Sequence, residues 1–270
     1  MTKKQETHSY RTLFISDVHL GTRGCKAQML LDFLKDCDAA TFYLVGDMVD
    51  GWRLKSSWYW PQAHNDVVQK LLRHVRKGVR VIYIPGNHDE FMREYLGLSF
   101  GGVEVMDEAI HTTADGRRFL VTHGDQFDIV VRHARWLAYF GDWAYEMALW
   151  SNTWFNKARR MMGLPYWSFS AWAKLRVKNA VNFIGAFEEA LAAEAEKQAA
   201  DGVICGHIHH AAIRQIGTIT YVNTGDFVES CTAIAEHHDG RLEILTWRDV
   251  PAHEKAADAL EPASPVSAAA

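Results

Sequence analysis

The chain has 270 residues, 48% of them hydrophobic, and a formal net charge of -4. This length and apolar content suffice for one large domain or for a domain with an insertion. The slightly acidic balance argues against a general nucleic-acid-binding protein. Four cysteines are scattered along the chain, so neither a disulfide framework nor a zinc knuckle is expected.

The first ten residues are polar and lack the apolar core of a secretory signal, so we expect residues 1–10 to be disordered. No uninterrupted apolar run reaches the about 18 residues of a transmembrane helix. Residues 251–270 are rich in Ala, Pro, Glu and Ser, which predicts a disordered tail. We therefore expect an ordered domain over residues 11–250 in a cytoplasmic protein, with any membrane contact peripheral.

Short apolar runs alternate with longer helical stretches, a rhythm typical of α/β domains. The predicted strands are residues 12–16, 41–45, 80–84, 119–122, 203–205 and 219–222. Apolar residues that recur three and four apart predict helices over residues 27–35 and 63–76. Residues 232–247 predict two further strands around Asp239 and Gly240, which favour a hairpin turn.

Roughly 80 residues separate the fourth and fifth predicted strands, far more than a usual connection. Helical patterns predict an insertion at about residues 128–185, which holds six of the ten tryptophans. Residues 132–178 carry eight Lys or Arg and two acids. Helices of this kind can lie in a membrane interface or form a lid over acyl chains. The alternative is a helical subdomain with a tryptophan core and a solvated cationic face. A second cluster is expected to form the wall that faces this insertion. It consists of Trp52, Trp58 and Trp60 with Arg53 and Lys55.

Residues of the kinds that bind metals begin within a residue or two of the ends of five predicted strands. The carboxyl ends of strands are where ligands gather in α/β sheets, so five segments should converge on one edge. A single Asp or His in such a place is more often a turn, cap or ordinary polar residue, but seven together favour a metal site. The candidate ligands are Asp17, His19, Asp47, Asn87, His123, His207 and His209.

These residue types suit a pair of divalent cations, because a carboxylate can bridge two metals while imidazoles and an amide oxygen complete their coordination. Asp47 is the predicted bridge. Glycines beside the ligands, Gly46, Gly86, Gly124 and Gly206, permit tight turns. Asp50 and Asp125 are either partners that orient a ligand or turn residues. The remaining candidates, His111, His133 and His210, are interpreted as ordinary histidines.

Five motifs together resemble the blocks of the calcineurin-like metallophosphoesterases, in family order over about residues 12–247. They are Ser16-Asp17-Val18-His19, Gly46-Asp47, Gly86-Asn87-His88-Asp89, His123-Gly124-Asp125 and Gly206-His207-Ile208-His209. The resemblance implies an α/β fold of the metallophosphoesterase type, a β-sandwich flanked by helices (α/β/β/α), with the helical insertion as a lid.

The resemblance also implies a role for each residue. One metal would be held by Asp17, His19, Asp47 and His209, and the second by Asp47, Asn87, His123 and His207. His88 would lie beside the metals and stabilise the transition state or protonate the leaving oxygen, and Asp89 would orient it. A histidine suits this role because its pKa lies near neutrality.

Within that family, residues 46–52 and the insertion between His123 and His207 resemble the UDP-2,3-diacylglucosamine diphosphatases. That resemblance implies hydrolysis of a pyrophosphate to a lipid monophosphate and UMP in lipid A synthesis, with manganese, at the membrane surface. Two features depart from the group. The established members usually carry Arg at the position of His88, and an Asp-Asp-Tyr stretch where this chain has residues 126–130.

The leading hypothesis is hydrolysis of a phosphate ester or pyrophosphate at two divalent cations. The resemblance implies Mn, and Fe, Zn or Co are alternatives because these ligand types suit all four metals. The expected partners are a lipid-linked or nucleotide phosphoester and an anionic membrane surface, the inner membrane. Candidate substrate contacts are Arg132, Arg135, Arg159, Arg160 and Trp52. The alternatives are a phosphodiesterase or phosphomonoesterase acting on another phospholipid or nucleotide, and a non-catalytic scaffold. The scaffold is disfavoured because no ligand position is missing. No particular oligomeric state is predicted.

Overall fold

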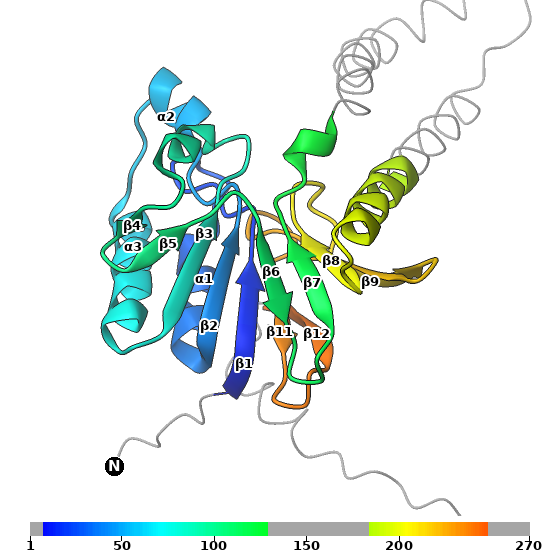
Figure 1. Ribbon diagram of the computed structural model, residues 1–270. Coiled ribbons are helices and arrows are strands. Elements are labelled where there is room, and N and C mark those ends of the chain that lie inside the picture. Colours follow the sequence, from blue (N-terminus) through cyan, green and yellow to red (C-terminus); the bar gives the residue numbers. More distant parts are fainter. Residues whose placement is uncertain (1–7, 129–183, 248–270) are drawn as a thin grey trace, which may run out of the picture.

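The computed structural model of the protein describes residues 8–128 and 184–247. Two β-sheets pack against each other, and helices cover the outer side of each (Figure 1). The first sheet has the strand order β12-β11-β1-β2-β3-β5-β4, and the second has the order β6-β7-β8-β10-β9. This arrangement confirms the predicted α/β sandwich flanked by helices.

The strands of the first sheet are β1 His8–Ile15, β2 Cys37–Val45, β3 Arg80–Ile84, β4 Ser99–Phe100, β5 Val103–Val105, β11 Thr232–Glu236 and β12 Leu242–Thr246. Those of the second are β6 Ala109–Thr112, β7 Arg118–Val121, β8 Gly202–Cys205, β9 Ala212–Ile216 and β10 Ile219–Asn223. The helices are α1 Ala27–Asp36, α2 Gly51–Ser56, α3 Gln62–Arg76, the 3-10 helices η1 Glu90–Tyr95 and η2 Asp125–Asp128, and a helix over residues 184–197.

The central strands of each sheet are parallel. β1 pairs with β2 and β2 with β3 in one sheet, while β7 pairs with β8 and β8 with β10 in the other. Their carboxyl ends therefore lie side by side at one edge of each sheet. The loops that leave these ends carry the predicted metal ligands.

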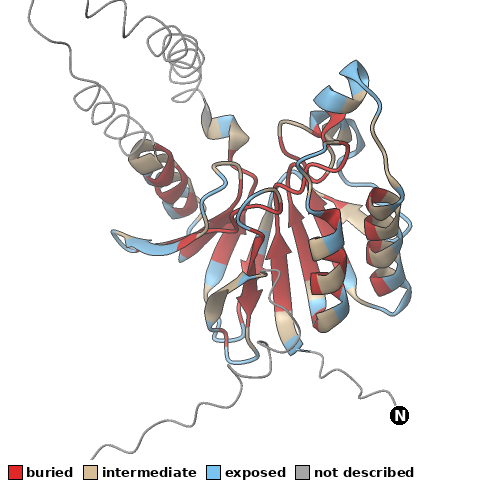
Figure 2. Ribbon diagram, turned by 180° about the vertical axis from the view of Figure 1, so that it is seen from behind, coloured by how far each residue is buried: buried red, intermediate tan, exposed pale blue. Residues whose placement is uncertain are grey.

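Three buried clusters hold the layers together. Between the sheets, Phe14 stacks on Tyr43 and packs with residues of the second sheet such as Phe119 and Val121. The outer face of the first sheet packs against α1 and α3. The outer face of the second packs against residues 184–197 through Phe187. Buried residues accordingly run along the strands and the inward faces of the helices (Figure 2). Each fully buried side chain of this size contributes about 1.5–3 kcal/mol.

The structure differs from the sequence prediction at several boundaries. β1 begins at His8, inside the range expected to be disordered, because His8–Tyr10 pair with Cys37–Ala39 of β2. The strands β4, β5, β6 and β9 and the helix α2 were not predicted, since they are short and mostly exposed and carry weak periodicity. Most of the predicted lid and tail lies outside the described residues. No helix among the described residues is long and apolar enough to span a bilayer.

Candidate metal centre

Five loops bring the seven predicted ligands to one end of the sandwich. Asp17 and His19 follow β1, Asp47 follows β2, and Asn87 follows β3. His123 follows β7, and His207 and His209 follow β8. Six of the seven, all except Asn87, fall into His and Asp groups whose ligand atoms lie within 4.8 Å of one another. The parallel strand ends therefore converge as the sequence predicts.

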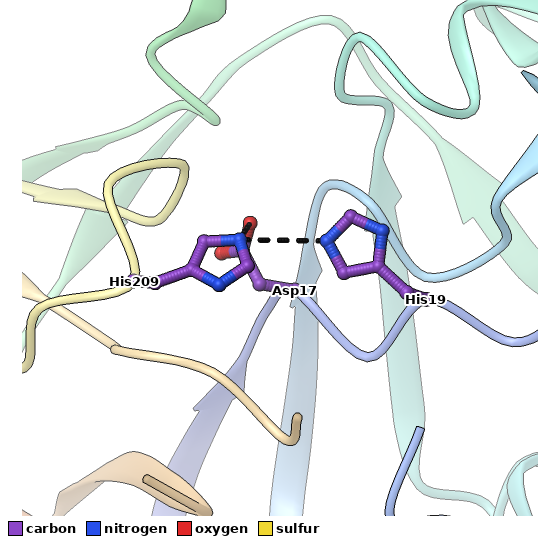
Figure 3. Close-up of side chains that lie close together, drawn as sticks. All are labelled: Asp17, His19 and His209. Carbon is purple, nitrogen blue, oxygen red and sulfur yellow. Dashed lines mark hydrogen bonds and ion pairs between the residues drawn. The ribbon is translucent and has the colours of Figure 1, made fainter. Parts of the chain in front are cut away.

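The first group consists of Asp17, His19 and His209 (Figure 3). Nε2 of His209 lies 3.2 Å from Oδ1 of Asp17 and 3.4 Å from Nε2 of His19. The two rings and the carboxylate point toward one another from loops that are 190 residues apart in the chain. This is a donor set of two imidazoles and a carboxylate, which suits a borderline divalent cation.

Asp47, His123 and His207 form a second group. Oδ2 of Asp47 is 3.4 Å from Nε2 of His123 and 3.9 Å from Nε2 of His19. The Asp47 carboxylate therefore lies between the two groups, which is the position that a bridging ligand requires. Nδ1 of His123 lies 2.9 Å from the carbonyl of Val45, and this contact directs Nε2 toward Asp47.

Buried ligand-type atoms without a hydrogen bond show that a cation fits here. Oδ1 of Asp17, Oδ1 of Asn87 and Nε2 of His123 are buried and form none. Leaving such an atom unsatisfied costs about 1–3 kcal/mol, and most buried polar atoms in folded proteins are satisfied. All three belong to predicted ligands. The donor set therefore gains its missing partners when cations bind.

Backbone strain concentrates at the same residues. Seven non-glycine residues have a positive φ in the described structure, and five of them are the predicted ligands Asp17, His19, Asp47, His207 and His209. A positive φ is uncommon outside glycine, even for aspartate and histidine, and it persists only where the surrounding structure enforces it. The fold thus holds these loops in unfavourable backbone conformations, in which the ligand side chains point toward one site.

Three glycines make room for the ligands, and a Cβ on one of them, Gly86, would lie 2.3 Å from Oδ1 of Asp47. A Cβ on Gly46, whose φ is 79°, would lie 2.1 Å from Nδ1 of His123. A Cβ on Gly206 would lie 2.6 Å from Oδ2 of Asp17. Any side chain at these three positions would displace a ligand, so glycine is required there for steric reasons.

Asp89 has a different role from the predicted one. Its carboxylate accepts hydrogen bonds from the backbone N–H groups of Gly86, Met48, Asp47 and Val49, at 2.6, 2.8, 3.3 and 3.3 Å respectively. The hydroxyl of Tyr83 also donates to it. Asp89 thereby joins the loop that carries Asp47 to the loop that carries Asn87. None of its described contacts is with the ring of His88.

Asp50 is the carboxylate beside His88. Its Oδ2 lies 3.0 Å from Nδ1 of His88, an ion-pair distance without hydrogen-bond alignment, and 3.5 Å from Nδ1 of His19. Its Oδ1 accepts a hydrogen bond from the backbone N–H of Arg53 and so caps α2. The alternatives left open for Asp50 are resolved: it contacts both a predicted ligand and the predicted catalytic histidine. The Gly46-Asp47 motif with an aspartate three residues later was the available sequence signal.

The electrostatics of the cluster favour ionised carboxylates. Burial opposes ionisation of Asp47, but His123, His88 and His19 outweigh it and lower its pKa. Burial likewise opposes the charged form of His123, yet Asp47, Asp17 and Asp125 raise the pKa of His123 to about 10. The carboxylates thus carry the negative charge that a pair of cations would neutralise.

His88 sits at the outer side of the cluster. Its ring centroid lies 4.6 Å from that of His19 and 4.3 Å from that of Trp52. Nε1 of Trp52 donates a hydrogen bond to Oε1 of Glu90. Trp52, a predicted substrate contact, is thus next to the predicted catalytic histidine.

The structure also places the other candidates. Asp125 accepts two hydrogen bonds from Arg93, at 2.8 and 2.9 Å, and ties η2 to η1. His111 packs edge-on against both Phe14 and Tyr43, whereas His210 is exposed. The candidates Arg132, Arg135, Arg159, Arg160 and His133 lie outside the described residues.

Two sets of hydrogen bonds that hold the ligand loops at this edge were not predicted from the sequence. The hydroxyl of Ser16 donates to Oδ2 of Asp17, and Oγ1 of Thr224 lies 2.5 Å from the same hydroxyl. Nδ2 of Asn223 donates to the carbonyl of Gly206 at 2.7 Å. Asn223 ends β10, which was a predicted strand on the same edge, so its position was the available signal.

Two curated proteins resemble part of this chain. A UDP-2,3-diacylglucosamine hydrolase from Porphyromonas gingivalis is 28% identical over 120 residues, 42% of this chain and 45% of that protein. One from Aliivibrio fischeri is 30% identical over 117 residues, 42% of this chain and 47% of that protein. The match thus spans less than half the length of either relative.

Solved structures resemble the chain more distantly. Vps29 with zinc from Entamoeba histolytica matches with a TM-score of 0.42 at 14% identity, over 88% of this chain and 99% of that one. A phosphoesterase from E. coli has a TM-score of 0.39 at 15% identity with the same coverage. The sequence model described as calcineurin-like phosphoesterase matches residues 10–211. The chain therefore belongs to the calcineurin-like phosphoesterase family of metal-dependent hydrolases.

Proposed function

We propose that the protein hydrolyses a phosphate ester or pyrophosphate at a pair of divalent cations. The observation that carries the proposal is the convergence of the ligand set from five loops, with three buried ligand atoms left without hydrogen bonds. Bound cations would lower the pKa of a water and hold the attacking and leaving oxygens of a phosphoryl group. Imidazole, carboxylate and amide donors suit Mn, and also Fe, Zn and Co.

The chain's own residues supply the rest of the proposed mechanism. Asp17, His19 and His209 would hold one cation, Asn87, His123 and His207 the other, and Asp47 both. His88 stands at the outer side of this set, where a proton on its ring can pass to the leaving oxygen. Asp50 fixes the orientation of that ring, and Trp52 covers one of its faces.

The proposed substrate is UDP-2,3-diacylglucosamine, cleaved to a lipid monophosphate and UMP in lipid A synthesis. Support comes from the two curated relatives, whose names state this hydrolase activity. We also propose that the enzyme is cytoplasmic and works peripherally on the inner membrane, where such a lipid substrate would reside. Trp52 beside His88 is the proposed contact among the described residues, and the four insertion arginines are proposed in addition.

A substrate panel tests this proposal. UDP-2,3-diacylglucosamine, UDP-glucosamine without acyl chains and bis(p-nitrophenyl) phosphate are compared at equal metal loading, with UMP or nitrophenol release as the readout. The proposal expects the diacylated substrate to be cleaved with the highest kcat/KM. Equal kcat/KM for the first two would instead support a phosphodiesterase acting on another nucleotide or phospholipid. His88 in place of the usual arginine favours that second candidate.

Metal content tests the catalytic assignment itself. The purified protein is analysed for Mn, Fe, Zn and Co, and then titrated with each after chelation. Binding of about two cations per chain is expected. A protein that binds no cation would instead support the non-catalytic scaffold.

A further inference from the structure

Exposed apolar side chains gather on one flank of the first sheet. The described structure has nine exposed large hydrophobic residues, and seven of them lie between residues 52 and 100. We call this set the aromatic flank. It comprises Trp52, Trp58, Phe91, Tyr95, Leu96, Leu98 and Phe100. Trp58 is 76% exposed and Leu98 55% exposed. Isolated exposed apolar residues are ordinary, whereas a gathered set marks an interaction surface.

The aromatic flank is continuous from α2 through η1 to β4, which lie along one side of the molecule (Figure 1). Trp52 bonds Glu90 of η1, and the ring of Phe91 lies against Gly51 of α2. Tyr95 at the end of η1 packs edge-to-face on Phe100 of β4, with ring centroids 5.4 Å apart. These contacts join three short elements into one surface.

Cations surround this surface. Residues 51–79 contain six Lys or Arg and one acid, in a chain whose net charge is -4. Arg53 and Lys55 are exposed on α2 beside Trp52. Arg73, Arg76 and Lys77 are exposed at the end of α3. That end meets the β4–β5 turn, where Val75 lies against Gly102. The acids nearby are Glu90 and Glu94 on η1 and Glu104 on β5, the last paired with Arg80, so the excess of cations lies in residues 51–79.

The flank also reaches the metal centre. Trp52 belongs to both, because its ring lies 4.3 Å from the ring of His88. A ligand seated on the flank is therefore adjacent to the predicted catalytic histidine.

We infer that the aromatic flank docks on the anionic surface of a lipid bilayer. Tryptophan and tyrosine favour the boundary between water and acyl chains, while neighbouring Lys and Arg meet anionic headgroups. A second copy of the chain fits less well, since a symmetric contact would place the cationic α2–α3 segments of two copies against each other. The inference deepens the proposed function and rests on its lipid substrate. It assigns the membrane contact to the core fold.

Vesicle cosedimentation of the full chain tests the inference. Vesicles of phosphatidylcholine are compared with vesicles that also contain phosphatidylglycerol, at low and high salt. We expect binding to require the anionic lipid and to weaken as salt screens the charges. The variant Leu96→Ser/Leu98→Ser should bind about tenfold more weakly or worse, because two apolar side chains no longer enter the interface. Arg73→Glu/Arg76→Glu should lose about fivefold in vesicle binding per cation removed.

The matched control is Ile110→Ser/Ile213→Ser, which removes the two exposed hydrophobic residues that lie off the flank. This variant should bind vesicles as the wild type does. Vesicle binding that survives in both flank variants would overturn the inference. A chain that dimerises in solution, with Leu98→Ser abolishing the dimer, would also overturn it, since a second copy would then occupy the flank.

Hydrolysis of bis(p-nitrophenyl) phosphate separates this test from that of the proposed function. The flank variants Leu96→Ser/Leu98→Ser and Arg73→Glu/Arg76→Glu should retain wild-type hydrolysis of this soluble diester and wild-type metal content. If they lose vesicle binding alone, docking is supported. If the wild type binds vesicles but hydrolyses no phosphoester, the proposed function fails while the docking surface stands.

Discussion

Two buried clusters of histidine and carboxylate differ in how completely their polar atoms are paired. One of them is the metal centre. In the other, which lies between the sheets, Glu236 accepts hydrogen bonds from Arg11 and from the backbone N–H of Ala114. Its other oxygen lies 2.8 Å from Nε2 of His111. Both Glu236 oxygens are thus paired, and none of these four residues has a positive φ. The metal centre has buried ligand atoms without hydrogen bonds and five ligands with a positive φ.

The difference separates a cluster that stabilises the fold from one that is shaped for a ligand. A buried carboxylate with all its partners holds its elements together, and removal of one partner is strongly destabilising. A cluster with unpaired ligand atoms lacks part of its own stabilisation until something binds. The same residue types therefore have different functions, and four predictions test this distinction.

The largest effect is expected at the bridging position. Asp47→Ala should remove most bound metal and lower phosphoester hydrolysis by about 10³-fold, because both cations lose a ligand and several kcal/mol of transition-state stabilisation. Elemental analysis and steady-state kinetics measure both losses. The control Asp32→Ala removes an exposed carboxylate that pairs with Lys35, and it should change neither. Full activity in metal-free Asp47→Ala would contradict a metal-dependent centre.

The paired cluster should respond in the opposite way. Glu236→Ala should lower the free energy of unfolding by about 3 kcal/mol, since it breaks a buried ion pair, and should leave metal stoichiometry unchanged. Urea unfolding measures the first and elemental analysis the second. Glu243→Ala breaks a surface pair with Arg241 and should cost less than about 1 kcal/mol. Equal stability of Glu236→Ala and the wild type would remove the distinction between the clusters.

Asp50 lies at the border of the metal centre and should show a smaller effect. Asp50→Asn should reduce kcat by about 10–100-fold, the usual cost of losing a partner that orients a functional group. Because His88 is proposed to protonate the leaving oxygen, the loss should be greater for an alkyl phosphodiester than for bis(p-nitrophenyl) phosphate, whose leaving group needs little assistance. Asp115→Asn, a surface control, should have wild-type kinetics. An equal loss on both substrates would assign Asp50 to ligand support alone.

The smallest effect concerns pH. Burial opposes ionisation of Glu236, but His111, Thr12 and Ala114 outweigh it and lower its pKa from 4.5 to about 2. A lowered pKa in the folded state gives stability that is present above about pH 4.5 and is lost as the pH falls toward 2. Urea unfolding of wild type and Glu236→Gln should therefore converge over this range. A constant difference in unfolding free energy would show that ionisation of Glu236 does not stabilise the fold.

Much of the fold and the ligand set could be predicted from the sequence because both depend on local signals. The apolar runs that became β1, β2, β3, β7, β8 and β10 have strand periodicity, and the candidate ligands follow the ends of five of them. Short exposed elements such as β4 and α2 have little such signal, since pairing and packing with distant residues hold them in place.

The sequence by itself determined which residues could bind metals and on which edge they would meet. Only the tertiary structure decided how their neighbours act. Asp89 and Asp50 both follow ligand motifs, yet Asp89 binds the backbone of two loops while Asp50 lies beside His88. The reason is physical: the partner of a carboxylate depends on the direction of the loop that carries it. That direction is set by packing between residues distant in the chain, as when the parallel ends of β2 and β3 bring Asp47 and Asp89 together.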